Sequence, residues 1–220
     1  LVLLICELVS RFEILSSKYF PPVTATVTAL LAEAGGTVFW KGLWYTLEGW
    51  GMGLLCGTAL ATVFGLIFGA SPFLLRSFRL IIEALRPIPA VALIPLAVLV
   101  FGIDITTKVV LVAFSVFWPM LYQVIYGVRD VDAVARDTAR SYRLTTWQRI
   151  RYLLLPSAAP YYMTGLRISA SIALIVCVAT ELVIGAPGFG ALINAAQASG
   201  AHDIEYAYIM ATGLLGWFLS

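Results

Sequence analysis

Charged side chains are scarce in this chain of 220 residues: Asp, Glu, Lys and Arg make up 12% of it, and hydrophobic residues 61%. Soluble domains carry about 25% charged residues, because a folded chain in water needs a polar surface. The composition therefore excludes an ordinary soluble domain, and it excludes a disordered chain, which would be poor in apolar residues. The net charge of +2 is too small to indicate a nucleic acid partner. A polytopic membrane protein is the class that remains.

Histidine and cysteine are also rare. His202 is the single histidine, so no His-based metal or catalytic cluster is expected. Cys6, Cys56 and Cys177 lie in apolar runs, and we expect free thiols rather than disulfides or a metal site. No phosphate-binding loop of the G-x-x-x-x-G-K-[ST] kind occurs, so we expect no catalytic residues, no nucleotide hydrolysis and no cofactor bound by this chain.

Hydrophobic runs divide the chain into membrane spans of about 20 residues. Both ends are expected to be truncated, because the chain begins at Leu1 without methionine and stops at Ser220 inside an apolar run. The expected elements are a partial span at 1–9, an interfacial helix at 23–34, spans at 46–70, 80–101, 108–127 and 160–185, and a last span from 206. A polar turn at 71–79 and a connection at 186–205 would join them. The expected fold is all-α: one transmembrane domain over 1–220, with about five to six helices.

Two of these spans have an unusual composition. The span 46–70 is rich in glycine, which lets helices approach closely in lipid. The span 80–101 contains Pro87, Pro89 and Pro95, which break a helix locally. Because broken backbone at membrane depth needs protein or water as a partner, we expect this span to face a pathway. A rigid packing kink is the alternative.

Arginines set the expected orientation, since basic residues accumulate in cytoplasmic loops. Eight arginines fall in the connections 71–79 and 128–155, against four basic residues on the opposite side. The eight are Arg76, Arg79, Arg129, Arg136, Arg140, Arg143, Arg149 and Arg151, and the four are Arg11, Lys18, Lys41 and Lys108. Both connections are therefore predicted to be cytoplasmic.

The connection 128–155 is the most polar part of the chain. Residues 132–142 favour a helix with a charged face, and Thr145 or Thr146 is a candidate N-cap for a second short helix. Tyr142 and Trp147 lie among arginines, a combination typical of docking surfaces. The connection is either such a surface or merely a solvated positive loop.

Motifs in and around this connection resemble a known family. Asp137-Thr138-Ala139, then Arg143, then Leu155-Pro156 resembles the EAA…G…LP loop of permease subunits of bacterial ABC importers. Residues 72–104, 127–132, 156–169, 179–181 and 188–190 are similar to the nitrate, sulfonate, taurine and bicarbonate branch of that family. Asp137 replaces the family glutamate. Arg143 replaces a glycine, and only glycine adopts positive φ without cost.

The resemblance implies a multi-pass permease of the bacterial plasma (inner) membrane that imports a small anion or sulfonate-like solute. Its implied partners are a second permease copy in a homodimer, two cytoplasmic ATP-binding subunits that hold ATP and Mg, and an extracytoplasmic substrate-binding protein. No nucleic acid is implied. The glycine-rich face of 46–70 would supply close packing in the dimer. The residues that would couple to the ATPase are Asp137, Thr138, Ala139, Arg140, Arg143 and Trp147.

Ionisable groups inside spans are expensive and usually face the bundle interior or a cavity. Glu181 ends an apolar run and is a candidate for the pathway or its outer gate. A structural hydrogen bond near the outer interface is an equally good interpretation. The residues expected to line the pathway are Pro89, Pro95, Ser169, Ala173, Thr180 and Glu181.

Two rival classes are weaker. An ion-coupled secondary transporter or channel needs inverted repeats and several midplane ionisable residues. We find no clear repeat, and Glu181 and Glu83 are the only candidates for such a site. A membrane-embedded enzyme would need clustered His, Asp or Cys side chains, and the single His202 argues against it.

Overall fold

The computed structural model describes residues 7, 10–12 and 19–219, so that the expected partial span at 1–9 lies almost wholly outside the described residues, as does Cys6. The helices are α2 (Val23–Ala34), α3 (Thr37–Ala70), α4 (Pro72–Leu85), the 3-10 helix η1 (Ala90–Leu93), α5 (Ile94–Phe101), α6 (Ile105–Arg129), α7 (Ala133–Ser141), α8 (Thr146–Arg149), the π-helix η2 (Ile150–Leu154), α9 (Leu155–Ile184), α10 (Phe189–Ser199) and α11 (His202–Leu219). Within the described residues there is no strand, so the expected all-α class is confirmed.

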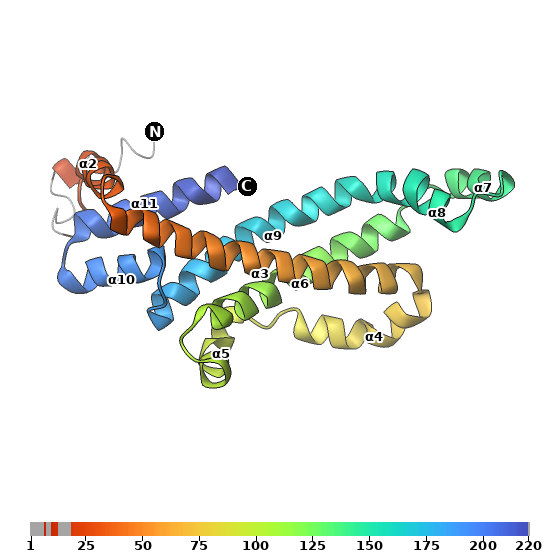
Figure 1. Ribbon diagram of the computed structural model, residues 1–220, viewed down its shortest axis with the longest axis horizontal. Coiled ribbons are helices and arrows are strands. Elements are labelled where there is room, and N and C mark those ends of the chain that lie inside the picture. The colour runs from red at the N-terminus through yellow and green to blue at the C-terminus, as the bar shows by residue number, and fades with distance from the viewer. Residues whose placement is uncertain (1–6, 8–9, 13–18, 220) are drawn as a thin grey trace.

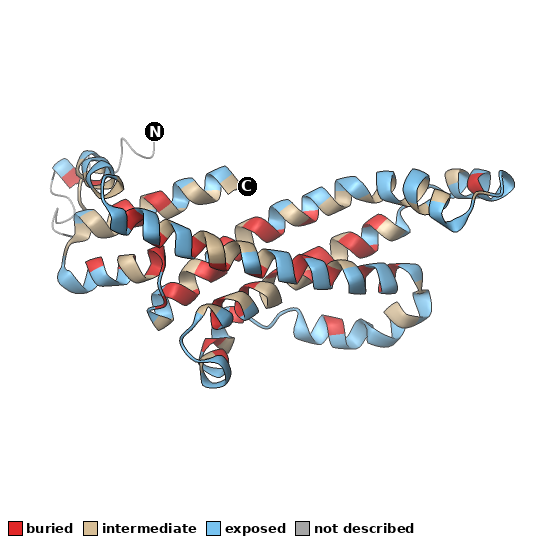
Figure 2. Ribbon diagram, viewed as in Figure 1, coloured by how far each residue is buried: buried red, intermediate tan, exposed pale blue. Residues whose placement is uncertain are grey.

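Helix α6 occupies the centre of an elongated bundle and packs against α3 on one side and α9 on the other (Figure 1). Val112 and Val116 of α6 belong to one apolar cluster with α5 and α9, and Leu121 and Val124 to a second with α3 and α4. Figure 2 shows buried residues along the facing sides of these helices and exposed residues on the outward sides. In a membrane, the exposed apolar sides face lipid or a partner.

Small residues on α3 recur every fourth position and face α6. They are Gly49, Gly53, Gly57, Ala61, Gly65 and Gly69, and all are buried. A Cβ added to Gly57 would lie 2.7 Å from the carbonyl oxygen of Ala113, which cannot move without its helix. The glycine-rich face therefore packs α3 against α6 of the same chain. The expectation that this face packs two permeases together is wrong, because α6 already covers it.

The proline-rich segment is broken as expected. Helix α4 and the η1–α5 segment are bent by 77°, and the break contains Pro87 and Pro89, which cannot donate to a helix. Pro95 lies in the first turn of α5, where the missing donor is not needed.

The expected polar turn at 71–79 is wrong. Ser71 alone separates α3 from α4, and its side chain accepts a hydrogen bond from the amide of Leu74 at 3.4 Å. Pro72 follows at the first helical position, where its fixed φ favours a helix start. This serine–proline start signal outweighs the polarity of the residues after it.

The expected connection at 186–205 is also wrong in part, because it contains α10, which packs against α9 and α11. Gly185 and Gly200 end α9 and α10 with φ of 68° and 74°. Glycines in this stretch thus terminate helices in the left-handed conformation instead of forming an open loop. Helix α11 begins at His202, four residues before the expected span.

Among the residues that the structure describes, three helical stretches are long and apolar enough to cross a membrane: α3, α6 and the continuous stretch Thr146–Ile184. The bent pair α4 and η1–α5 makes a fourth if it counts as one span. The expected five to six spans therefore included shorter elements. Helix α2, at 12 residues, is about 18 Å long, which fits the expected interfacial helix and not a span.

Replacing Gly57 by alanine should destabilise the protein by about 1–3 kcal/mol, because the new methyl group would overlap the backbone of α6. Gly51→Ala is the matched control on the same helix, since nothing lies within 4 Å of its added Cβ. Alanine there should raise stability by about 1 kcal/mol through helix propensity. Thermal unfolding in detergent measures both variants, and equal melting temperatures would contradict the close approach of α3 and α6.

Candidate functional site

Helices α7 and α8 form a compact loop (residues 130–149, the α7–α8 loop) at one end of the molecule, beyond the ends of α3, α6 and α9 (Figure 1). The side chain of Asp132 caps α7 by accepting a hydrogen bond from the amide of Val134 at 2.7 Å. Thr145 and Gln148 form a reciprocal capping box at the start of α8. The expected pair of short helices is confirmed, with Thr145 as the N-cap.

Arg143 has a φ of 52° and is the one non-glycine residue with positive φ among those described. The amide of Leu144 donates to the carbonyl oxygen of Ala139 at 3.0 Å, and the amide of Arg143 donates to that of Arg140 at 2.9 Å. These two bonds are the Schellman pattern that normally ends a helix at glycine. The turn therefore keeps the geometry that glycine provides in the family motif, at a cost of about 1–2 kcal/mol.

One face of α7 packs inward and the other is exposed. Val131 and Ala139 are buried and Ala135 is half-buried, at a spacing of four residues. Val134, Tyr142 and Trp147 are 73%, 77% and 65% exposed. The α7–α8 loop thus has an exposed apolar and aromatic surface.

The predicted coupling residues divide between these faces. Asp137, Thr138, Arg140, Arg143 and Trp147 are exposed, and Asp137 and Arg140 form a solvent-exposed ion pair at 3.5 Å. Ala139 is only 5% exposed, so it supports the α7–α8 loop from within and is not itself open to a partner.

The α7–α8 loop continues into α9 without a break. The π-helix η2 follows α8 and leads directly into α9, so residues Thr146–Ile184 form one helical stretch of 39 residues. Short π-helical insertions recur at functional sites. This stretch connects the α7–α8 loop to the opposite end of the molecule.

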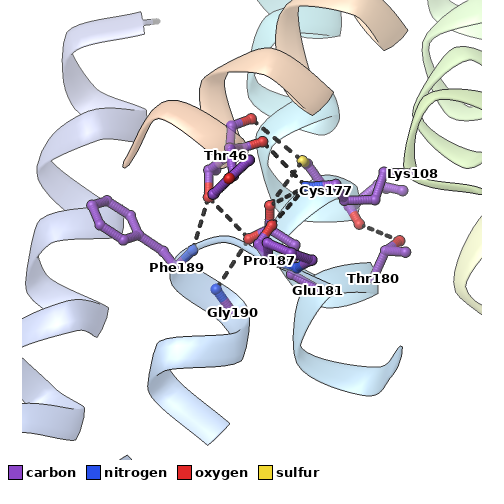
Figure 3. Close-up of polar contacts among 10 residues, drawn as sticks. Thr46, Lys108, Cys177, Thr180, Glu181, Pro187, Phe189 and Gly190 are labelled. Carbon is purple, nitrogen blue, oxygen red and sulfur yellow. Dashed lines mark hydrogen bonds and ion pairs between the residues drawn. The ribbon is translucent and has the colours of Figure 1, made fainter. Parts of the chain in front are cut away.

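At that opposite end, Lys108 of α6 and Glu181 of α9 form a buried ion pair with Nζ and Oε1 3.0 Å apart (Figure 3). Their exposed fractions are 2% and 0%. Lys108 Nζ also donates to the carbonyl oxygens of Tyr45 at 3.1 Å and Pro187 at 2.8 Å. All three ammonium donors therefore have acceptors, as a buried charge requires.

The second carboxylate oxygen of Glu181 joins α3 and α10 to this pair (Figure 3). Oε2 accepts from the hydroxyl of Thr46 at 2.9 Å and from the amide of Gly190 at 3.0 Å, and the Thr46 hydroxyl accepts from the amide of Phe189 at 2.9 Å. At the start of α10, the amide of Gly190 thus meets a carboxylate, which the helix dipole favours, and the amide of Phe189 meets a hydroxyl. A Cβ added to Gly188 would lie 2.1 Å from the Glu181 carboxyl carbon, so only glycine fits there.

The sequence placed Lys108 at the start of the expected span 108–127, among the basic residues of the opposite side, and no role in an ion pair was predicted for it. Lys108 lies in the first turn of α6, before the apolar run that begins at Val109. A single lysine beside an apolar run, together with a single glutamate at the end of another, is a signal for an intramembrane ion pair. For Glu181 this geometry supports the structural interpretation that had been left open.

The predicted pathway residues are not equally accessible. Pro89 and Pro95 are exposed, whereas Ser169, Ala173, Thr180 and Glu181 are fully buried inside the single chain. Ala173 belongs to the apolar cluster between α5, α6 and α9. These four residues would reach a pathway only if α9 moved away from its neighbours, and their assignment stays a prediction.

The apolar helical bundle is that of a membrane protein, and comparison with known proteins gives its class, a transport subunit. A family model described as binding-protein-dependent transport system inner membrane component matches residues 53–220. The chain is 29% identical to the taurine transport system permease protein TauC of Escherichia coli (strain K12), over 96% of this chain and 78% of that protein. It is 25% identical to the nitrate import permease protein NrtB of Leptolyngbya laminosa, over 83% and 65%.

The fold resembles a chain of the MetNI methionine ABC transporter in an inward-facing conformation, with a TM-score of 0.70, 18% identity, and coverage of 83% of this chain and 91% of that chain. The chain belongs to the family of binding-protein-dependent transport system inner membrane components. It is a permease subunit of an ABC transporter in the plasma membrane, of the nitrate, sulfonate and taurine branch. The expected family and fold are confirmed.

Glu181→Gln should destabilise the permease by about 3–5 kcal/mol, because it leaves the Lys108 ammonium buried without a counter-charge. The double variant Lys108→Met/Glu181→Gln should lose less than the sum of the two single variants. Glu83→Gln is the control, since its ion pair with Arg79 is exposed and is worth at most about 1 kcal/mol. Unfolding of the purified permease measures all four, and additive losses in the double variant would rule out direct coupling.

Arg143→Gly should stabilise the α7–α8 loop by about 1 kcal/mol, because glycine adopts positive φ without the steric cost. Hydrogen exchange at the amides of Tyr142 and Leu144, which bond back to α7, should slow accordingly. Arg140→Gly, inside α7, should have the opposite effect. Faster exchange in Arg143→Gly would mean that the arginine side chain stabilises the turn.

Proposed function

We propose that this permease, paired with a second copy of itself, imports a small sulfonate or another small anion. Relatives named for taurine, aliphatic sulfonates and nitrate support this solute class. Two separate cytoplasmic subunits would bind ATP and Mg and hydrolyse the ATP, and an extracytoplasmic protein would deliver the solute. In this proposal the chain itself has no catalytic residues and binds no cofactor.

The exposed surface of the α7–α8 loop is the observation that carries the coupling proposal. Tyr142 and Trp147 are large, apolar and exposed on the side predicted to be cytoplasmic, where lipid cannot cover them. Apolar patches rimmed by charge mark protein contacts. Because the loop continues into α9, a displacement of the docked ATPase would be transmitted directly to a membrane-crossing helix.

The exposed faces of the bent segment support pairing of two permeases. Leu80 of α4 and Leu99 of α5 are 78% and 83% exposed, and Figure 2 shows α4 exposed along nearly its whole length. The three or four candidate spans within the described part of the chain enclose little space for a solute. A second copy across α4 and α5 would complete a pathway that includes Pro89 and Pro95.

Trp147→Ala should weaken binding of the ATPase subunit, by roughly tenfold or more if Trp147 anchors the contact. Trp44→Ala is the matched control, because Trp44 is 66% exposed, nearly the same as Trp147, but lies at the opposite end of the molecule. Co-purification from membranes and ATPase-driven uptake of taurine measure the effect.

Two differently tagged permease copies should co-purify in the same experiment. Unchanged ATPase binding and uptake in Trp147→Ala would contradict docking at this loop. Complexes that contain one permease copy and retain uptake would contradict the homodimer.

A further inference from the structure

A cleft of about 740 Å³ lies between α4, α6 and the start of α9, toward the end that carries the α7–α8 loop. Its charged residues are Arg79, Glu83, Arg86, Arg129 and Asp130, and its tyrosines are Tyr122, Tyr126 and Tyr161. Three arginines and two carboxylates leave the cleft with a net charge of +1. None of the coupling residues or predicted pathway residues lines it.

The acidic groups in the cleft are already engaged. Glu83 accepts from Arg79 at 2.7 Å, and Asp130 accepts from the hydroxyl of Tyr161. Arg86 and Arg129 have no ion pair with any residue that the structure describes. The Arg86 guanidinium carbon lies 4.8 Å from the centre of the Tyr122 ring, which orients the cation without neutralising it.

The depth of Arg86 makes an unpaired charge costly. Arg86 caps the C-terminal end of α4, 14 residues and about 21 Å along the helix from Pro72 at the cytoplasmic end. A cation at such a depth in a membrane segment needs water, a partner or a ligand. The cleft offers it space for a ligand, and the hydroxyls of Tyr122 and Tyr126 add donors that make no hydrogen bond within the described residues.

We propose that this cleft binds an oxoanion group of the sulfonate or phosphate type, held by Arg86 and Arg129. Guanidinium groups bind such tetrahedral anions through paired hydrogen bonds, which suits two arginines without carboxylate partners. The group comes either from a soluble organic sulfonate or from the headgroup of an anionic phospholipid, since both present the same oxygens. The site does not depend on which solute the permease transports.

Residue-specific modification tests this site in the intact permease–ATPase complex, held in phosphatidylcholine nanodiscs. Phenylglyoxal reacts with free guanidinium groups, and peptide mass spectrometry gives the rate at each arginine. Addition of isethionate, a small soluble sulfonate, or replacement of part of the lipid by phosphatidylglycerol should slow modification of Arg86 and Arg129 at least threefold. Arg76 is the internal control, because it is exposed on the same helix but does not line the cleft.

Protection by isethionate identifies a soluble anion as the ligand, and protection by phosphatidylglycerol alone identifies a lipid headgroup. Either result supports the oxoanion site. Absence of protection in both arms overturns it, as does equal protection of Arg76, which would show general screening of surface charge.

Two variants, Arg86→Gln and Arg76→Gln, test the role of Arg86 through the protection of Arg129, so that the result does not depend on the modification of Arg86 itself. In Arg86→Gln, protection of Arg129 should require roughly tenfold more of the effective anion, because a charge-assisted hydrogen bond has been lost. Arg76→Gln should leave the required concentration unchanged. Co-purification with the ATPase checks that both variants fold, and identical protection curves for the two variants refute the role of Arg86.

Discussion

A buried ammonium and a buried carboxylate join four elements at the end of this permease that lies opposite the α7–α8 loop. Lys108 and Glu181 link α6 to α9 directly, and Thr46 and the first amides of α10 complete the network. Removing two charges from water costs several kcal/mol per ion, and attraction offsets this only when every donor and acceptor is satisfied. That condition is met here, so the geometry of α3, α6, α9 and α10 is mutually dependent. Displacing α6 or α9 would leave a buried charge without its counter-charge, and displacing α3 or α10 would remove hydrogen bonds that the buried pair needs.

This network and the α7–α8 loop occupy the two ends of the same long helix. The small residues at every fourth position of α3 allow close packing of α3 against α6. Helix α4, in contrast, has a single buried residue, Ile82. The α3–α6 pair is therefore the rigid part of the chain, and the bent segment is the part with few internal contacts. Such a division lets the end with the ion pair stay fixed while the segment beside the cleft between α4 and α6 changes its packing.

Local signals in the sequence predicted the local structure well. The N-cap at Thr145 and the helix break at Pro87 and Pro89 were predicted, because these effects act within a few residues. The orientation of Ala139 could not be predicted with the same certainty, since it depends on which face of α7 meets the rest of the loop. The family motif identified the segment but did not show which of its side chains are exposed.

Contacts between residues far apart in the chain could not be predicted from the sequence. Lys108 and Glu181 are 73 positions apart, and each has a plausible separate explanation as a loop cation or an interfacial carboxylate. Helix α10 was missed because its bounding glycines favour a loop when they are considered alone. Its amides meet acceptors from α3 and α9, so its stability comes from tertiary contacts that no local pattern displays.

The π-helix η2 determines how the α7–α8 loop is rotated around the axis of α9. A π-turn holds one more residue than an α-helical turn, and one residue corresponds to about 100° of rotation around a helix. The direction in which Trp147 points therefore depends on a single additional residue in this short segment. Within this family, insertion or loss of one residue at this position would turn the exposed aromatic face of the α7–α8 loop to a different side of the molecule while leaving both the long helix and the loop helices intact.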